Sequence, residues 1–168
     1  MLHLSQHWPQ AVLVGELLAA ARTAPGVNKA GHGADLDTQV LAANLLPAYS
    51  YSKELASLHT FAPAVAASVS DRPIASPVAR LQAQQRSYVT NQYHEQIALD
   101  PTSRYLLPLL DGSRDWKALL QALAGVVTDG KPAVQQTGGG GGYANPLPPD
   151  AQLTEALAML RRSALLVG

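Results

Sequence analysis

The residues whose side chains are best suited to catalysis are His94 and Glu95, which are adjacent in the sequence. A histidine beside a carboxylate can act in acid–base catalysis. Neighbouring residues of an extended segment point to opposite faces, however, so these two side chains are poorly placed to act together. Polar side chains more often serve as hydrogen-bond partners. We therefore expect Asn91, His94 or Glu95 to fix a linker segment onto the second domain, with catalysis as the minority alternative.

A second chemical candidate is the pair His3 and His7, whose spacing of four residues places both on one helix face. Such a pair could form half of a metal site, but a zinc site needs further ligands. The chain has no cysteine, which excludes disulfides, thiolate zinc sites and a cysteine nucleophile. It also lacks the serine-elbow, HExxH and glycine-rich dinucleotide motifs. The sequence therefore predicts no catalytic, cofactor-binding or metal-binding residue, and no autonomous enzyme.

The composition excludes several kinds of partner. The 168 residues contain 12 basic and 12 acidic side chains, so no strong field attracts nucleic acid or an anionic membrane. No apolar run approaches the ~18–20 residues of a membrane span. The first ten residues do not resemble a signal peptide. We expect a soluble, cytoplasmic protein that binds neither nucleic acid nor membrane.

Helical periodicity dominates the chain and predicts a mainly α protein with short β-strands. We expect strands at 54–61 and 165–167, an extended segment at 87–99, and a kink or helix end at Pro47. The clearest helix start is Asp100 followed by Pro101, and Gly112 is expected to close that helix. The expected helices cover 2–8, 13–23, 36–50, 77–86, the stretch from Pro101 to Gly112, the stretch after Ser113, and 151–164, with Asp35, Ser76, Ser113 and Asp150 as further caps.

These elements predict two winged-helix-like modules. Three helices and a strand in the first 60 residues have a winged-helix layout, which gives a module over 1–62. A linker over 63–75 then leads to a C-terminal winged-helix-like domain over 76–168. An insertion over 128–149 contains five consecutive glycines, Gly138–Gly142. It lacks the Gly-Lys-Ser/Thr ending of a phosphate loop, so we expect a flexible segment of unknown purpose.

Several short stretches along the chain form a recognisable set in a fixed order. They are Gln6-His7-Trp8-Pro9, Gly15-Glu16-Leu17-Leu18, the stretch from Arg72-Pro73-Ile74-Ala75 to Gln82, Val89-Thr90-Asn91 with His94-Glu95, Leu106-Leu107-Pro108-Leu109-Leu110-Asp111-Gly112, and Ala164-Leu165-Leu166-Val167. Together they resemble the C-terminal region of bacterial S-adenosylmethionine-dependent methyltransferases that contain a methyltransferase regulatory domain, including the protein-lysine methyltransferases. The similarity spans almost the whole chain, and 24–34 and 128–149 match least.

The resemblance implies a non-catalytic regulatory or substrate-recognition module that acts through protein–protein contacts. In this family the methyl donor binds a domain further upstream, so no catalytic or cofactor-binding residue can be assigned here. The implied partner is a methyltransferase catalytic domain or its protein substrate, and the chain is either a separate subunit or part of a larger enzyme. The candidate interaction residues, chosen because they are polar and lie in or beside the matched segments, are Arg80, Gln84, Asn91, His94 and Glu95.

Two alternatives belong to other functional classes. A winged helix suggests DNA binding, but the predicted third helix, 36–50, contains no Lys or Arg and begins beside Asp35 and Asp37. The other alternative is a homodimeric scaffold, in which an apolar helix face such as that of 151–164 pairs with its copy.

Overall fold

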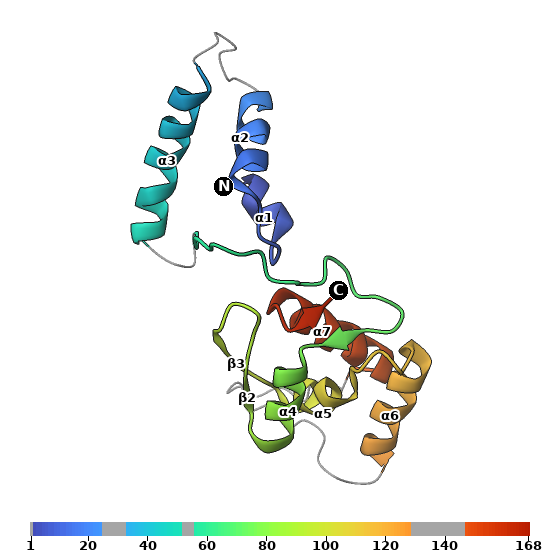
Figure 1. Cartoon of the computed structure of the whole chain (residues 1–168). Helices are drawn as coiled ribbons and strands as arrows, with labels where there is room; N and C mark the ends of the chain where they lie inside the picture. Colours follow the sequence, from blue (N-terminus) through green and yellow to red (C-terminus); the bar gives the residue numbers. More distant parts are fainter. Residues whose placement is uncertain (1, 25–32, 52–55, 129–146) are drawn as a thin grey trace, which may run out of the picture. The chain divides into compact units, whose positions relative to one another are not determined.

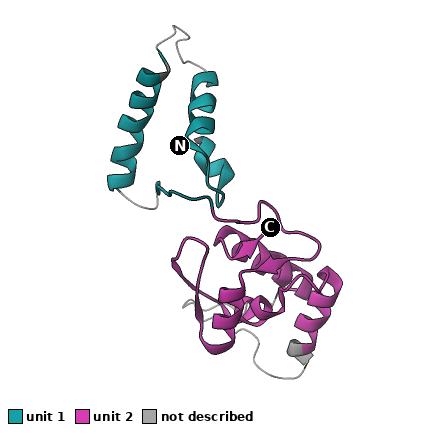
Figure 2. Ribbon diagram, viewed as in Figure 1, with its two compact units in different colours: residues 1–62 teal, residues 63–168 magenta. Residues whose placement is uncertain are grey.

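The computed structural model describes residues 2–24, 33–51, 56–128 and 147–168. Contacts divide the chain into two compact units, residues 1–62 and residues 63–168 (Figure 2). The fold is mainly helical with a few short strands, which confirms the predicted fold class. None of the described helices is both long and apolar enough to cross a bilayer. The predicted insertion falls mostly on residues 129–146, outside the described residues.

Unit 1 contains three helices in its described residues: α1 (Leu2–His7), α2 (Val14–Thr23) and α3 (Ala34–Tyr51). Helices α2 and α3 lie side by side (Figure 1). An ion pair joins them, with Arg22 Nε 2.8 Å from Asp37 Oδ2. Among the described residues of this unit only Pro9 is buried, so few apolar side chains are removed from water.

Three expectations for unit 1 are wrong in detail. Of the two outcomes expected at Pro47, a helix end is wrong, because α3 continues to Tyr51, and a kink stays a prediction. Proline removes one helix hydrogen bond, and the carbonyl that loses this bond belongs to the exposed Ala43, where water can replace it. The helix begins at Ala34, so Asp35 lies inside the first turn and does not cap the helix. Its negative charge still interacts favourably with the helix dipole there.

The third error is the strand expected at 54–61. Residues 56–61 form no strand, and 52–55 lie outside the described residues. An isolated strand gains no ladder hydrogen bonds, and the described part of unit 1 offers it no partner strand. The winged-helix-like module expected over 1–62 is therefore not confirmed, and with it the presence of two such modules.

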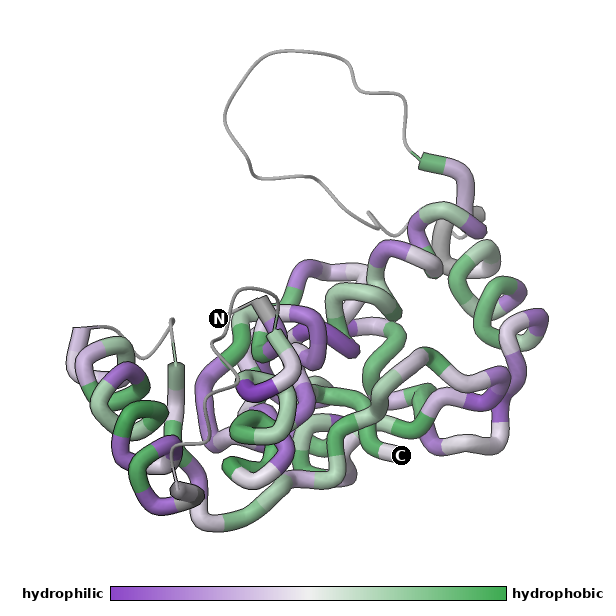
Figure 3. Tube along the Cα trace, turned by 90° about the horizontal axis from the view of Figure 1, so that it is seen from above, coloured by the Kyte–Doolittle hydropathy of each residue, from purple (hydrophilic) through white to green (hydrophobic). Residues whose placement is uncertain are grey.

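In unit 2 a strand near the beginning of the unit pairs with a strand at its end. Strand β1 (Ile74–Ala75) pairs antiparallel with strand β4 (Leu166–Val167), with Ala75 opposite Leu166. Figure 3 shows hydrophobic residues in the segment that leads to the C-terminus. Residues 63–75, expected to be a linker, belong to this unit, where Val65 and Ala66 are buried.

Between these two strands lie a hairpin and the remaining helices. Helix α4 (Pro77–Gln85) is followed by the antiparallel strands β2 (Tyr88–Thr90) and β3 (Gln96–Ala98). Next come α5 (Pro101–Leu106), the 3₁₀ turn η1 (Leu107–Leu109), α6 (Trp116–Thr128) and α7 (Pro149–Arg162). One apolar core joins these helices, and its fully buried leucines include Leu106, Leu107, Leu110, Leu119, Leu123, Leu153, Leu157 and Leu160.

The apolar face of α7 is part of this core. Leu153, Leu157 and Leu160 are at most 1% exposed. The idea that this face pairs with a second copy is therefore wrong, because the core of unit 2 already covers it.

The helix caps were predicted with mixed success. Asp100 accepts the Ser103 N–H at 3.0 Å, which confirms the strongest capping prediction. Ser76 occupies the cap position of α4 but makes no capping hydrogen bond. Ser113 does not cap α6, because its hydroxyl and N–H both donate to Asp111, and Asp115 accepts the Ala118 N–H instead.

Asp150 is also not a cap. Helix α7 begins at Pro149, after Pro148 at the cap position, so Asp150 lies within the first turn.

Candidate interaction groove

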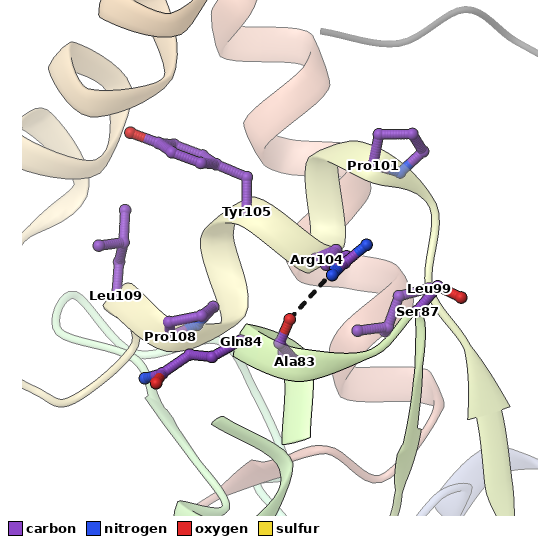
Figure 4. Close-up of a pocket in the computed structure, with 9 residues that line it drawn as sticks. All are labelled: Ala83, Gln84, Ser87, Leu99, Pro101, Arg104, Tyr105, Pro108 and Leu109. Carbon is purple, nitrogen blue, oxygen red and sulfur yellow. Dashed lines mark hydrogen bonds between the residues drawn. The ribbon is translucent and has the colours of Figure 1, made fainter. Parts of the chain in front are cut away.

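A groove of about 520 Å³ lies on unit 2 between α4 on one side and α5 and η1 on the other (Figure 4). Its volume is within the range of small-ligand and side-chain pockets. We call it the α4–α5 groove. It is lined by Ala83, Gln84, Ser87, Leu99, Pro101, Arg104, Tyr105, Pro108 and Leu109.

Three side chain to backbone hydrogen bonds brace the walls of the groove. Arg104 Nε donates to the Ala83 carbonyl at 3.2 Å, joining α5 to α4. Arg80 Nε donates to the Pro108 carbonyl at 3.4 Å, joining α4 to η1. The Tyr105 hydroxyl donates to the Ala122 carbonyl at 3.1 Å, joining α5 to α6. The groove is therefore largely formed before anything binds, which lowers the entropic cost of binding.

The chemistry of the groove is apolar with one positive charge. Leucine, proline, alanine and tyrosine side chains provide most of the lining. Arg104 is the only charged residue among the nine, all of which the structure describes, and Figure 4 shows it between Pro101 and Tyr105. None of the described carboxylates forms an ion pair with Arg104. The arrangement can bind an apolar group beside a negative charge, but it contains no nucleophile and base in mutual contact.

The structure brings only one of the predicted interaction residues to this groove. Gln84 is exposed on α4 and lines it. Arg80 does not line the groove, but it holds the lining residue Pro108 through the hydrogen bond to the Pro108 carbonyl. The Nη2 atom of Arg80 lies 3.7 Å from Asp111 Oδ2.

Asn91, His94 and Glu95 lie instead in the turn between β2 and β3. Asn91 is 6% exposed, and its Oδ1 accepts the N–H groups of Tyr93 and Glu95, both at 2.9 Å. Its Nδ2 donates to Glu95 Oε2 at 2.9 Å. His94 has a positive φ of 62°, which fits the tight turn. These contacts hold the hairpin itself together, so Asn91 acts within the hairpin and not between a linker and a domain.

From the sequence, Pro101, Arg104 and Tyr105 were not predicted to line a binding groove, because they were placed only within a helix. The helical periodicity of this stretch nevertheless indicates which of its residues are exposed. Leu106 is completely buried, and helix residues two apart do not share a face, so Arg104 lies on the opposite side of the helix; both Arg104 and Tyr105 are exposed.

A second polar cluster centres on Asp111. Its pKa is lowered from 3.8 to about 2, chiefly by the Ser113 hydroxyl and then the Ser113 N–H, with Arg114 and Arg80 as further causes. Arg114 Nη1 lies 3.2 Å from Asp111 Oδ2. Because these partners satisfy one another, the cluster stabilises the loop that joins η1 to α6.

The histidine pair of α1 makes a local contact. The rings of His3 and His7 are 4.3 Å apart, and His7 Nδ1 lies 2.8 Å from the His3 carbonyl oxygen. In the described residues, no three His, Cys, Asp or Glu side chains are grouped as a metal site would require.

The short β1–β4 sheet, the β2–β3 hairpin and the helices packed on them define unit 2 as a winged-helix domain. The family model of the PKMT C-terminal winged helix domain matches residues 71–165, more than half of the chain. The chain therefore belongs to this family, which confirms the resemblance to protein-lysine methyltransferases.

Two solved structures support the fold. The structure of PKMT2 from Rickettsia typhi in complex with AdoHcy aligns with a TM-score of 0.66 and 18% identity, covering 94% of this chain and 31% of that chain. A second structure of PKMT2 from Rickettsia typhi aligns with a TM-score of 0.61 and 17% identity, covering 94% of this chain and 32% of that chain. The chain thus spans about a third of their length. No curated protein matches the sequence.

Proposed function

We propose that this chain is a non-catalytic regulatory or substrate-recognition module of an S-adenosylmethionine-dependent protein methyltransferase. It acts through protein–protein contacts, and its partner is a methyltransferase catalytic domain or the protein substrate of that domain. The chemistry of methyl transfer takes place outside the residues of this chain. We further propose that it works in the cytoplasm.

The family match over 71–165 is the observation on which this proposal rests. The α4–α5 groove is consistent with a binding role, because it is braced, apolar and exposed at Gln84 and Tyr105. Its lining offers an arginine but no paired acid and base, which favours recognition over catalysis. The predicted boundary after residue 62 remains part of this proposal, with 63–75 as the segment that leads into the C-terminal domain over 76–168 and packs with it.

Calorimetry tests the non-catalytic assignment. The purified chain is titrated with S-adenosylmethionine and with AdoHcy, and PKMT2 from Rickettsia typhi, whose structure contains AdoHcy, serves as the positive control. We expect no binding heat from the chain alone. Saturable binding together with methyl transfer by the isolated chain would overturn the proposal.

Affinity capture tests the interaction role. The tagged chain is incubated with cell extract, and the captured proteins are identified by mass spectrometry. We expect a methyltransferase, or a protein that a methyltransferase modifies on lysine, to be retained at a stoichiometric level. Retention of nucleic acid without protein would instead support the alternative of a winged-helix nucleic-acid binder.

A further inference from the structure

The α4–α5 groove has a composition that specifies the kind of partner it fits. Leu99 and Ala83 are at most 8% exposed and lie at its base, while Tyr105 is 37% exposed and forms a wall. Buried apolar residues at the base and an accessible ring at the side suit a short apolar side chain of a partner. The exposed surface continues along α4, because Leu81, three residues before Gln84, is 59% exposed on the same side of the helix.

The charge of the groove is equally specific. Arg104 contributes a guanidinium whose Nε is held by the Ala83 carbonyl, so the charged group has a fixed position. The nearest carboxylate in the sequence, Asp100, is engaged with the N–H and hydroxyl of Ser103, at 3.0 and 2.5 Å, as the cap of α5. A fixed cation with no acid among the lining residues favours a carboxylate on the bound partner.

We propose that the α4–α5 groove binds a short segment of a partner protein in which apolar side chains are followed by carboxylates. The apolar side chains contact Leu99, Tyr105 and Leu109, and one of the carboxylates pairs with Arg104. Gln84 also lines the groove, and Figure 4 shows its amide on the Pro108 side, so a charge placed at this position changes the electrostatic potential along the groove. This inference rests on the proposed function in protein–protein contact and names the surface and the chemistry of the partner.

Nuclear magnetic resonance on the full chain tests the proposal directly. The probe is a nine-residue peptide with two leucines followed by two glutamates between glycine–serine ends. Its matched peptides replace both glutamates by lysines, or both leucines by serines. We expect the leucine–glutamate peptide to cause saturable amide shifts at Ala83, Gln84, Ser87 and Arg104, and both matched peptides to bind more weakly.

Charge changes at Gln84 provide the decisive variants, because glutamine, glutamate and lysine have similar helix propensities and the position is exposed. We expect Gln84→Glu to weaken binding of the leucine–glutamate peptide roughly two- to five-fold, and Gln84→Lys to strengthen it by a similar factor. The controls are Gln39→Glu and Gln39→Lys, on an exposed glutamine of α3 that does not line the groove. These controls should leave the affinity unchanged.

The outcomes separate this proposal from the proposed function. Absence of saturable shifts, equal binding of the lysine peptide, or equal effects of the Gln84 and Gln39 variants would overturn the groove assignment. If the leucine–glutamate peptide causes no saturable shifts while the unsubstituted chain captures a methyltransferase, the groove assignment fails and the proposed function stands. If the unsubstituted chain captures no such protein while the peptide binds, the groove assignment stands and the proposed function fails.

Discussion

Gly112 has a left-handed backbone conformation that residues with a Cβ rarely adopt. Its φ is +82°, and a Cβ placed on it would lie 2.9 Å from Ile74 Cγ1. This close approach occurs where Ile74 bridges to Asp111, so the glycine allows the η1–α6 loop to reach strand β1. The residue thus connects the helical part of unit 2 to its sheet.

Replacing Gly112 by alanine should lower the free energy of unfolding by about 1–2 kcal/mol, because the left-handed conformation and the contact with Ile74 both oppose a Cβ. The control is Gly125→Ala in α6, where a Cβ meets nothing within 4 Å. That change should raise the free energy of unfolding by about 0.5–1 kcal/mol. Urea denaturation of the two variants measures both, and equal effects would contradict the assignment.

Asp111 makes the stability of the folded chain depend on pH. Its folded-state pKa of about 2 lies below the ordinary 3.8, so the carboxylate is favoured by the folded state. This contribution to stability is fully present above the unfolded pKa and is lost as pH falls from about 4 towards 2. Asp111→Asn should therefore be less stable than the unsubstituted chain at neutral pH, and the difference should shrink below pH 4.

Denaturation series at pH 6, 4 and 2 measure this difference. Ser113→Ala is the companion variant, because its hydroxyl is the largest cause of the lowered pKa. It should show a smaller difference with the same sign and the same pH window. A stability gap that is as large at pH 2 as at pH 6 would show that charge on Asp111 is not its origin.

At the scale of elements, α4 and α5 form a natural comparison. Both begin with a polar residue followed by proline, Ser76-Pro77 and Asp100-Pro101. Only Asp100 makes the capping hydrogen bond. Asp100→Ala should therefore cost about 0.5–2 kcal/mol, the usual value of a lost cap, whereas Ser76→Ala should change stability by less than about 0.5 kcal/mol.

Thermal unfolding followed by circular dichroism compares these two variants. Asp100→Asn is the control, because asparagine is as good a cap as aspartate and should retain most of the stability. A loss for Ser76→Ala as large as that for Asp100→Ala would mean that proline and backbone geometry, and not the side-chain bond, decide where these helices begin.

The same comparison explains how far the sequence predicted the elements. Helix positions followed from local signals: the start of α5 needs only Asp100, Pro101 and the periodic leucines after them. A strand was expected at 165–167, where β4 lies, but its pairing with β1 was not, because the two strands are almost a hundred positions apart and the two residues of β1 leave no period to recognise. The expected strand at 54–61 failed for the related reason that β structure depends on a partner.

The groove could be predicted only in part. Gln84 was chosen because it is polar and lies near the matched segments, and it lines the groove. Asn91 was chosen on the same grounds, yet it is buried and holds its own hairpin. Polarity alone does not distinguish these roles, because burial is set by the tertiary fold. Arg104 and Tyr105 were missed because their relation to α4 depends on packing between helices.

At the scale of the molecule, the two units differ most in how much apolar surface they bury. Unit 2 has a continuous core of fully buried leucines, whereas the described residues of unit 1 bury only Pro9. Large apolar side chains of unit 1 are exposed, including Leu13 at 63%, Val40 at 55% and Tyr51 at 86%. Burial of apolar surface offsets the entropy lost on folding, so the two units should differ strongly in intrinsic stability.

We therefore expect a fragment of residues 63–168 to unfold cooperatively, with a midpoint close to that of the main transition of the intact chain. A fragment of residues 1–62 should be helical only in part and should show no cooperative transition, because its described residues bury only Pro9. Calorimetry and amide hydrogen exchange on both fragments and the intact chain provide the measurement. A sharp heat-absorption peak from 1–62 alone would contradict this. Protection of α2 and α3 in the intact chain but not in the fragment would show that their stability comes from contacts beyond their own unit.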